Sequence, residues 1–165
     1  MKSDVTPIHL HRSAIPPRDL LELFALSDED ERFYWERPDC GEAILALGAA
    51  ARVESRGESH FGDAAAKVRG IQERLRDPCR LGGNGDAPAW AGPLLVGGFA
   101  FDFDAPAWER WAGFPTSQLV LPERLLIGRE GEMWCCRAGA GSAPADGDEF
   151  TVAPFPSERQ AAADD

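Results

Sequence analysis

The segment at residues 93–104, PLLVGGFAFDFD, is the feature that most constrains the fold of this chain. Its apolar residues leave almost no polar position, which predicts a strand that is covered on both faces. Gly97 and Gly98 inside the segment indicate a bulge or a close approach of another backbone. A sheet that contains such a strand needs packing partners on two sides, so the supply of helices decides whether the fold can close.

The sequence predicts one long amphipathic helix. Between Phe61 and Leu75, apolar residues recur at steps of three and four, which places them on one helix face. Ser59 suits the N-cap position, and Asp77 before Pro78 ends the helix, because the residue before a proline avoids helical geometry. A shorter helical turn is expected after Pro16 and Pro17, followed by an acidic loop. One long helix cannot cover a doubly buried sheet, so we expect exposed apolar area of the kind that marks a missing partner.

Several other segments favour strands. PIHLHRSAI near the N-terminus alternates loosely and is typical of an edge strand, and the aromatic run Phe33–Trp35 also favours extended structure. Residues 117–138 predict a strand, a kink at Pro122, a second strand, a turn at residues 129–131 and a third strand. Residues 42–55 are ambiguous: their alanines and leucines slightly favour a helix, but alternate apolar positions also fit a strand.

Charge and length exclude several classes of function. The 165 residues contain 17 Lys plus Arg and 28 Asp plus Glu, so the formal net charge is −11. This sign repels phosphate backbones and anionic membrane surfaces, so we expect no nucleic-acid or membrane partner. We find neither a secretory leader nor the roughly 18 consecutive apolar residues of a membrane span, which predicts a cytoplasmic protein. The four cysteines have no CxxC spacing and are expected to be free thiols.

Three motifs occur in an order that resembles a known family. They are FYWERPDCGEAILALGAAARVES, then PLLVGGFAFDFD, then WAGFPTSQLVLPERLLIGREGEMW, and they span roughly residues 33–134. In this order they resemble the N-terminal part of isochorismate synthases, members of the chorismate-using superfamily that includes anthranilate synthase component I. The resemblance implies an α+β fold of antiparallel β-sheets with flanking helices, of which this chain would be an incomplete half. It also implies that residues 42–55 form a strand.

The resemblance further implies how the chain is divided and what it lacks. Residues 1–138 would be the N-terminal, non-catalytic portion, and residues 139–165 a flexible linker or tail. The family exchanges a ring hydroxyl of chorismate, using a lysine base, a glutamic acid and Mg²⁺ held by glutamates, and these groups lie in the C-terminal half. No catalytic or cofactor-binding residue can therefore be transferred to this sequence. We expect the chain to be inactive and without a cofactor by itself, and its partner to be the missing C-terminal chorismate-binding half.

Local residues offer weak substitutes for these groups. Asp102 and Asp104 form a D-x-D pair after a strand, a spacing that can bind Mg²⁺, although a simple strand end explains them as well. Lys67 falls on the polar side of the long helix and reads as a surface lysine rather than a base of lowered pKa. His9 and His11 would share a strand face but lack a third metal ligand. Two further features read as structural: the core-packing aromatics Trp108, Trp111 and Phe114, and the GGNG loop at 82–85, which lacks the Lys-Ser/Thr of a phosphate loop.

Three hypotheses remain open from the sequence. The chain is a fragment of an isochorismate synthase of menaquinone or siderophore synthesis, or it is the N-terminal subunit of a split enzyme whose joint is the acidic tail after residue 140. The third hypothesis is a stand-alone binding or scaffold domain, which would need a closed core without an exposed apolar face.

Overall fold

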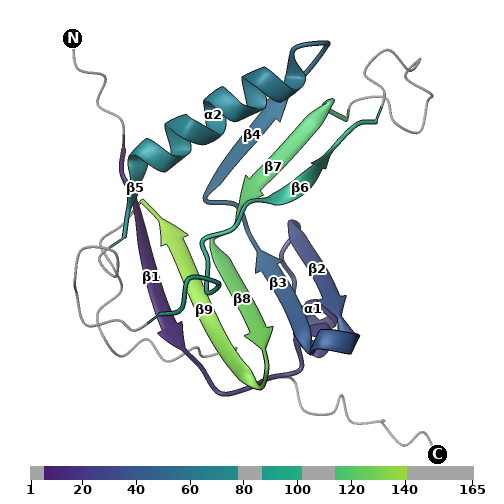
Figure 1. Ribbon diagram of the computed structural model, residues 1–165, viewed down its shortest axis with the longest axis vertical. Coiled ribbons are helices and arrows are strands. Elements are labelled where there is room, and N and C mark those ends of the chain that lie inside the picture. The colour runs from purple at the N-terminus through teal and green to yellow at the C-terminus, as the bar shows by residue number, and fades with distance from the viewer. Residues whose placement is uncertain (1–5, 78–86, 102–113, 141–165) are drawn as a thin grey trace, which may run out of the picture.

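The structure, a computed structural model, describes residues 6–77, 87–101 and 114–140. These residues form an α+β fold with two α-helices and two mostly antiparallel sheets (Figure 1). The elements are, in chain order, β1 (Ile8–Ala14), α1 (Leu20–Leu26), β2 (Arg32–Arg37), a 3-10 turn (Pro38–Cys40), β3 (Glu42–Leu47), β4 (Ala51–Ser55), α2 (His60–Arg74), β5 (Leu75–Arg76), β6 (Val96–Phe99), β7 (Ser117–Leu121), β8 (Arg124–Arg129) and β9 (Glu132–Gly139).

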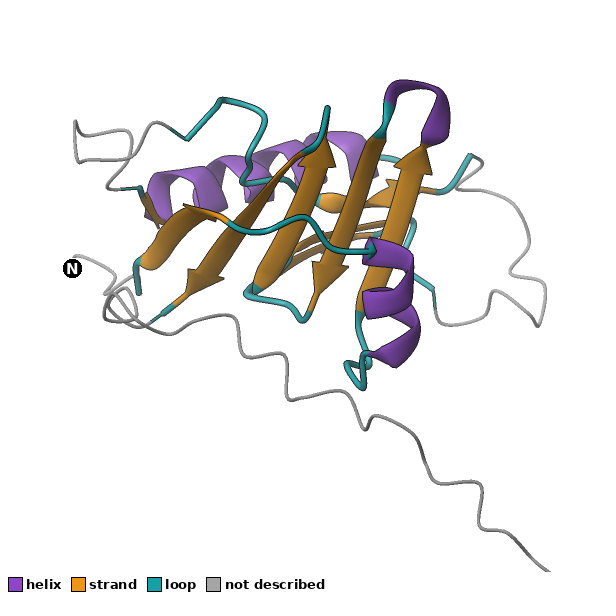
Figure 2. Cartoon of the chain, turned by 90° about the horizontal axis from the view of Figure 1, so that it is seen from below, coloured by secondary structure: helices purple, strands orange, loops and turns teal. Residues whose placement is uncertain are grey.

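The larger sheet has six strands in the order β2-β3-β8-β9-β1-β5. Neighbouring strands are antiparallel, except for the two-residue parallel pairing of β1 with β5. Helix α1 packs on one face of this sheet, where Leu20 and Leu23 contact the buried Leu45, Leu47 and Leu126. Asp19 starts α1 because its carboxylate accepts hydrogen bonds from the backbone N–H groups of Leu21 and Glu22. Figure 2 shows α1 lying beside the strands, away from α2.

The smaller sheet has three antiparallel strands in the order β4-β7-β6. Two bent segments of the chain run through both sheets: β3 continues as β4, and β7 continues as β8. In the larger sheet β3 pairs with β8, and in the smaller sheet β4 pairs with β7. The bends occur at Gly48, whose φ of +67° favours glycine, and at Pro122. Helix α2 lies along β4 and β7 (Figure 1).

The main hydrophobic core joins the two sheets and α2. It combines residues of the larger sheet, such as Leu10 and Leu125, with Val53 and Leu121 of the smaller sheet and Ile71 of α2. Each Å² of apolar surface that is removed from water stabilises the fold by roughly 25 cal/mol, so burial of this shared core holds the two sheets together.

Most sequence expectations for individual elements are confirmed. The hairpin is present, with its kink at Pro122 and a two-residue turn at Glu130 and Gly131, both of which have positive φ values. Residues 42–55 form β3 and β4, so the strand implied by the resemblance is right and the helix favoured by propensity is wrong. The hydrogen bonds that β3 makes with β8, and β4 with β7, outweigh the weak helix preference of alanine and leucine. Ser59 occupies the N-cap of α2, although its hydroxyl donates to Asp63 rather than capping the backbone.

The expectation of a doubly buried strand at 93–104 is wrong. Regular structure is limited to β6, and the exposed fractions of Leu94, Phe99 and Phe101 are 37%, 45% and 107%. The reason is the position of β6 at the edge of a three-stranded sheet, while α2 packs mainly on β4 at the opposite edge. Residues 102–104 lie outside the described part of the chain. The expected edge strand at the N-terminus is β1, which is second from the edge because two residues of β5 pair beyond it.

Candidate functional site

Several candidate residues from the sequence lie outside the described residues. These are the metal candidates Asp102 and Asp104, the aromatic residues Trp108 and Trp111, and the loop at 82–85. The division of the chain at residue 138 also remains a prediction, since β9 continues to Gly139 and the tail after residue 140 is not described.

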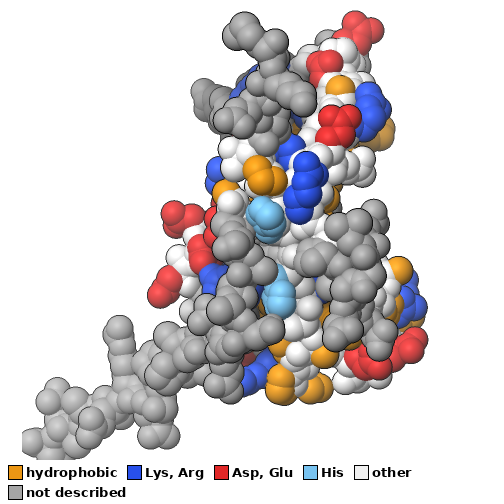
Figure 3. All heavy atoms as spheres, turned by 90° about the vertical axis from the view of Figure 1, so that its left-hand side faces the viewer, with side chains coloured by type: hydrophobic (Ala, Val, Ile, Leu, Met, Phe, Trp, Pro, Cys, Tyr) orange, Lys and Arg blue, Asp and Glu red, His pale blue; other side chains and the backbone are white. Residues whose placement is uncertain are grey.

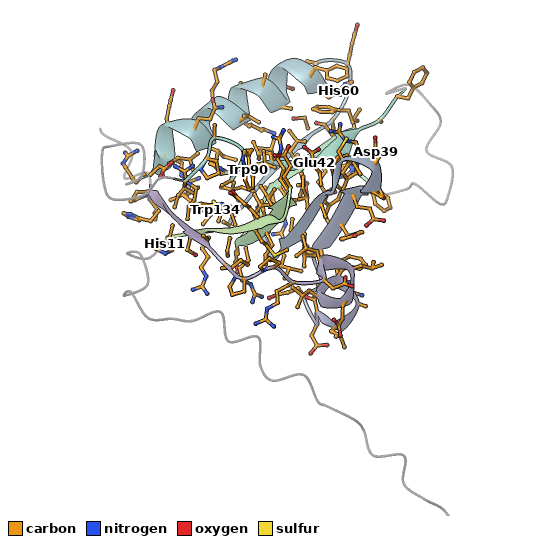
Figure 4. The ribbon with its side chains drawn as sticks, turned by 60° about the horizontal axis from the view of Figure 1, so that its bottom comes forward. His11, Asp39, Glu42, His60, Trp90 and Trp134 are labelled. Carbon is orange, nitrogen blue, oxygen red and sulfur yellow. The ribbon has the colours of Figure 1, made fainter. Side chains whose placement is uncertain are left out.

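The described candidates do not come together. Lys67 is exposed on α2, and its ammonium group donates a hydrogen bond to the carbonyl oxygen of Glu54, as expected for a surface lysine. His9 and His11 share one face of β1 through their register with β9, but Figure 4 shows His11 far from His60 at the start of α2. Within the described ranges no group of three His, Cys, Asp or Glu side chains could hold a metal ion.

The described cysteines fit the expectation from the sequence. Cys40 is exposed, Cys135 and Cys136 are buried, and none of the three forms a disulfide within the described residues. Because Cys135 and Cys136 are neighbours on β9, their side chains point to opposite faces of the sheet. Burial raises the pKa of the Cys135 thiol, and the positive charge of Arg137 only partly opposes this shift. A raised pKa keeps the thiol protonated, so Cys135 is not suited to act as a nucleophile.

A buried ion pair ties the N-terminal strand to the end of α2. Arg12 Nη2 lies 2.8 Å from Asp77 Oδ2, and both side chains are only 7% exposed. Arg12 also donates to the carbonyl oxygen of Gly92 at 3.4 Å. The pair connects β1, the segment after α2 and the segment before β6, so its role is to position elements. Sequence reasoning missed it because nothing in the sequence relates residues 65 positions apart.

A buried polar group lies between α2 and the smaller sheet. Ser55 and Ser117 face each other across β4 and β7, and their hydroxyl oxygens are buried without a hydrogen-bond partner among the described residues. His60, at the first position of α2, is also buried, and its Nδ1 lies 2.8 Å from the carbonyl oxygen of Gly57. A serine beside a histidine is a side-chain pair used in nucleophilic catalysis, but Nδ1 of His60 is directed at the backbone of Gly57. We assign it no chemistry.

A hollow of about 550 Å³ runs between β4 and the C-terminal half of α2. Its lining combines the basic residues Arg52, Lys67, Arg74 and Arg76 with the acidic Glu73 and three apolar or glycine residues. These cations already have partners: Arg52 Nη2 lies 2.7 Å from Glu31 Oε1, and Arg74 donates to the carbonyl oxygen of Thr6 at 3.0 Å. On the face shown in Figure 3, basic, acidic and apolar side chains are interspersed wherever described atoms are visible. Within the described residues, Glu31 compensates the charge of Arg52, and Glu73 adds a negative charge to the lining of the hollow.

The most unusual surface of the described residues is apolar. Phe61 of α2 and Phe99 of β6 stack at 4.9 Å between ring centroids, and both are exposed. Phe101 and Phe114 extend the same end of the smaller sheet, since the backbone N–H of Ala100 donates to the carbonyl oxygen of Thr116. We call Phe61, Phe99, Phe101 and Phe114 the aromatic face. The expectation that Phe114 packs in the core is wrong, because its exposed fraction is 61%. The predicted exposed apolar area is present.

Three comparisons with known proteins agree. A family model described as chorismate binding enzyme matches residues 2–150. The salicylate biosynthesis isochorismate synthase of Pseudomonas aeruginosa is 33% identical over 125 residues, which are 73% of this chain and 23% of that protein.

The menaquinone-specific isochorismate synthase of Escherichia coli provides a structural match. Its solved structure is similar with a TM-score of 0.51 at 20% sequence identity, over 81% of this chain and 24% of that chain. At this identity the match shows the fold alone. This chain thus spans about a quarter of the length of each of the two proteins that it matches. No helix among the described residues is long and apolar enough to cross a membrane.

Proposed function

Because the chain belongs to the chorismate-binding enzyme family, we propose that it is the N-terminal, non-catalytic portion of an isochorismate synthase. The parent reaction in this proposal is the Mg²⁺-dependent conversion of chorismate to isochorismate, in menaquinone or siderophore synthesis. The observation that carries the proposal is the 33% identity over 125 residues to an isochorismate synthase, of which this chain spans only 23%.

The chemistry of hydroxyl exchange supports a non-catalytic role. Hydroxide leaves a ring only when an acid protonates it, and water attacks only when a base is positioned beside it. The described residues bring no such acid and base together, and Lys67 at the surface donates a hydrogen bond to the backbone carbonyl oxygen of Glu54. In the proposal, Mg²⁺ and the proton-transferring groups belong to the remainder of the fold. This chain contributes packed sheets against which the remainder folds.

The second candidate is the N-terminal subunit of a split enzyme, which differs only in whether the remainder is a separate polypeptide. The exposed aromatic face is compatible with either arrangement. It argues against the third candidate, a closed scaffold domain, because such a domain would not leave the stacked Phe61–Phe99 pair exposed to water.

Complementation tests the proposal. The Pseudomonas aeruginosa relative is truncated to remove the 125 residues that match this chain, and the truncated protein is co-expressed with residues 1–165. We expect isochorismate to form from chorismate and Mg²⁺ only when both chains are present, with each chain alone as the control. The proposal is wrong if this chain alone converts chorismate, or if the co-purified pair converts none.

A further inference from the structure

We propose that the free edge of β6, with the aromatic face beside it, is the docking site for the remainder of the chorismate-binding fold, which adds a strand to β6. This inference rests on the proposed function and names the surface through which the two parts join. Three observations on β6 and its surroundings carry it.

The first observation is the incomplete pairing of β6. Among the described residues β6 pairs with β7 alone, through Val96↔Val120 to Phe99↔Ser117. Its outer edge is thus free within the described ranges, and a free edge presents backbone N–H and C=O groups that can pair with an added strand. Gly98 and Phe99 are exposed there, and a Cβ built on Gly98 would meet no atom within 4 Å. The face of the sheet at Gly98 is therefore also uncovered by described atoms.

The second observation is the close approach of β6 to β7. A Cβ built on Gly97 would lie 2.0 Å from the carbonyl oxygen of Gln118, so β6 approaches β7 more closely than any other residue type would allow. The φ of Gly97 is +149°, which also favours glycine. An edge strand that is held this closely keeps its outward N–H and C=O groups in fixed positions, which lowers the entropic cost of pairing with an added strand.

The third observation is the aromatic face next to this edge. The Phe61–Phe99 pair spans α2 and β6, so it lies over the end of the sheet that an added strand would extend. Burying a phenylalanine removes a large apolar surface from water, and central aromatic anchors dominate the energetics of many interfaces. Other exposed aromatic residues, Phe33 and Trp35 on β2, are not stacked with each other and have smaller exposed fractions than Phe61.

The occupant follows from the coverage of the relatives. The chain matches 24% of a solved structure with the same fold, and about three quarters of that structure lie outside the match. A protein with this missing part has a large body of its own fold to cover the surface, which makes an unrelated partner unnecessary. A second copy of this chain is the competing occupant, and the experiment below separates the two.

Co-purification tests the inference directly. Tagged residues 1–165 are co-expressed with the truncated Pseudomonas aeruginosa relative described above. The test variant carries Phe61→Ser and Phe99→Ser, and the matched control carries Leu21→Ser and Leu26→Ser, two exposed apolar residues of α1. We expect wild type and control to retain the truncated relative and the test variant to retain about tenfold less, as when buried aromatic anchors are removed. Equal retention by the test variant, or no retention by wild type, overturns the inference.

Two further measurements keep the outcomes distinct. Hydrogen exchange on the complex should slow at the amides of β6, and unchanged exchange there overturns the added strand. Sedimentation of the chain alone should show a monomer, and a dimer that the Phe61→Ser, Phe99→Ser variant abolishes would assign the face to self-association instead. A complex that forms through these residues but leaves chorismate unconverted would contradict the proposed function and not the docking surface.

Discussion

The two sheets of this chain differ in how far they are completed. The centre of the six-stranded sheet is covered on both faces, by α1 on one side and by the core shared with α2 on the other, and Leu45, Leu125 and Leu126 are at most 1% exposed. The three-stranded sheet has one helix and ends in the exposed aromatic face. The difference shows that the described residues cover the centre of the larger sheet but leave large apolar side chains at the end of the smaller sheet exposed.

The buried ion pair of the completed region should give the largest effect on stability. Asp77→Ala leaves Arg12 buried without its carboxylate, and breaking such a pair costs about 3–5 kcal/mol. Urea unfolding measures this loss. Asp39→Ala is the control, because the side chain of Asp39 is 76% exposed and should matter little. A loss under about 1 kcal/mol for Asp77→Ala would show that water reaches the pair and that this region is looser than described.

The apolar residues of the two regions should respond very differently to truncation. Leu126→Ala removes a side chain that is 0% exposed between β3 and β9 and should cost about 2–5 kcal/mol of unfolding free energy. Phe61→Ala removes a larger side chain that is 60% exposed and should cost less than about 1 kcal/mol. Thermal and urea unfolding of both variants check this contrast. Comparable losses would mean that the aromatic face is already buried in the chain alone.

Gly97→Ala tests how closely β6 must approach β7 in the three-stranded sheet. The new methyl group collides with the backbone at Gln118, so β6 should detach from β7 at a cost of about 1–3 kcal/mol. Gly98→Ala is the matched control, since its methyl group points into open space. Hydrogen exchange should show lost protection in β6 and β7 for the first variant only, with β8 and β9 unchanged. If protection is also lost in β8 and β9, the two sheets are not separable regions.

The smallest effect is the dependence of stability on pH through Cys135, which lies on β9 of the six-stranded sheet. The pKa of Cys135 is raised by burial, so the folded chain holds this proton at pH values where the unfolded chain releases it. Stability is therefore full below the ordinary thiol pKa and falls as pH rises above it, by at most about 1.4 kcal/mol per pH unit. Cys135→Ala should flatten this part of the pH profile of unfolding. An unchanged profile in the variant would show that Cys135 does not cause the loss.

The sequence predicted local structure well where one segment determines it. The hairpin around Pro122, the helix at 60–74 and the strand at 32–37 all follow from periodicity, turn residues and aromatic content. The position of β6 could not be predicted in this way, because an apolar strand has the same sequence whether its covering partner is in the chain or outside it. For the same reason an apolar stretch was read as doubly buried, although Phe99 and Phe101 are exposed.

The candidate site shows the same division. The absence of a transferable catalytic residue came from the order of the family motifs, which covers the chain from residue 33 to residue 134. The Arg12–Asp77 pair and the Phe61–Phe99 stack depend on contacts between distant residues, and only the fold brings these together. Asp102 and Asp104 lie outside the described residues, so their part in metal binding stays a prediction.

The central claim is that this chain supplies sheet packing but no hydroxyl-exchange chemistry. It is tested most directly by incubating purified residues 1–165, without any partner, with chorismate and Mg²⁺ and following isochorismate by chromatography. We predict no product above the rate without protein. Enzyme-dependent formation of isochorismate that saturates with chorismate would contradict the claim, since it would require an acid and a base within these 165 residues.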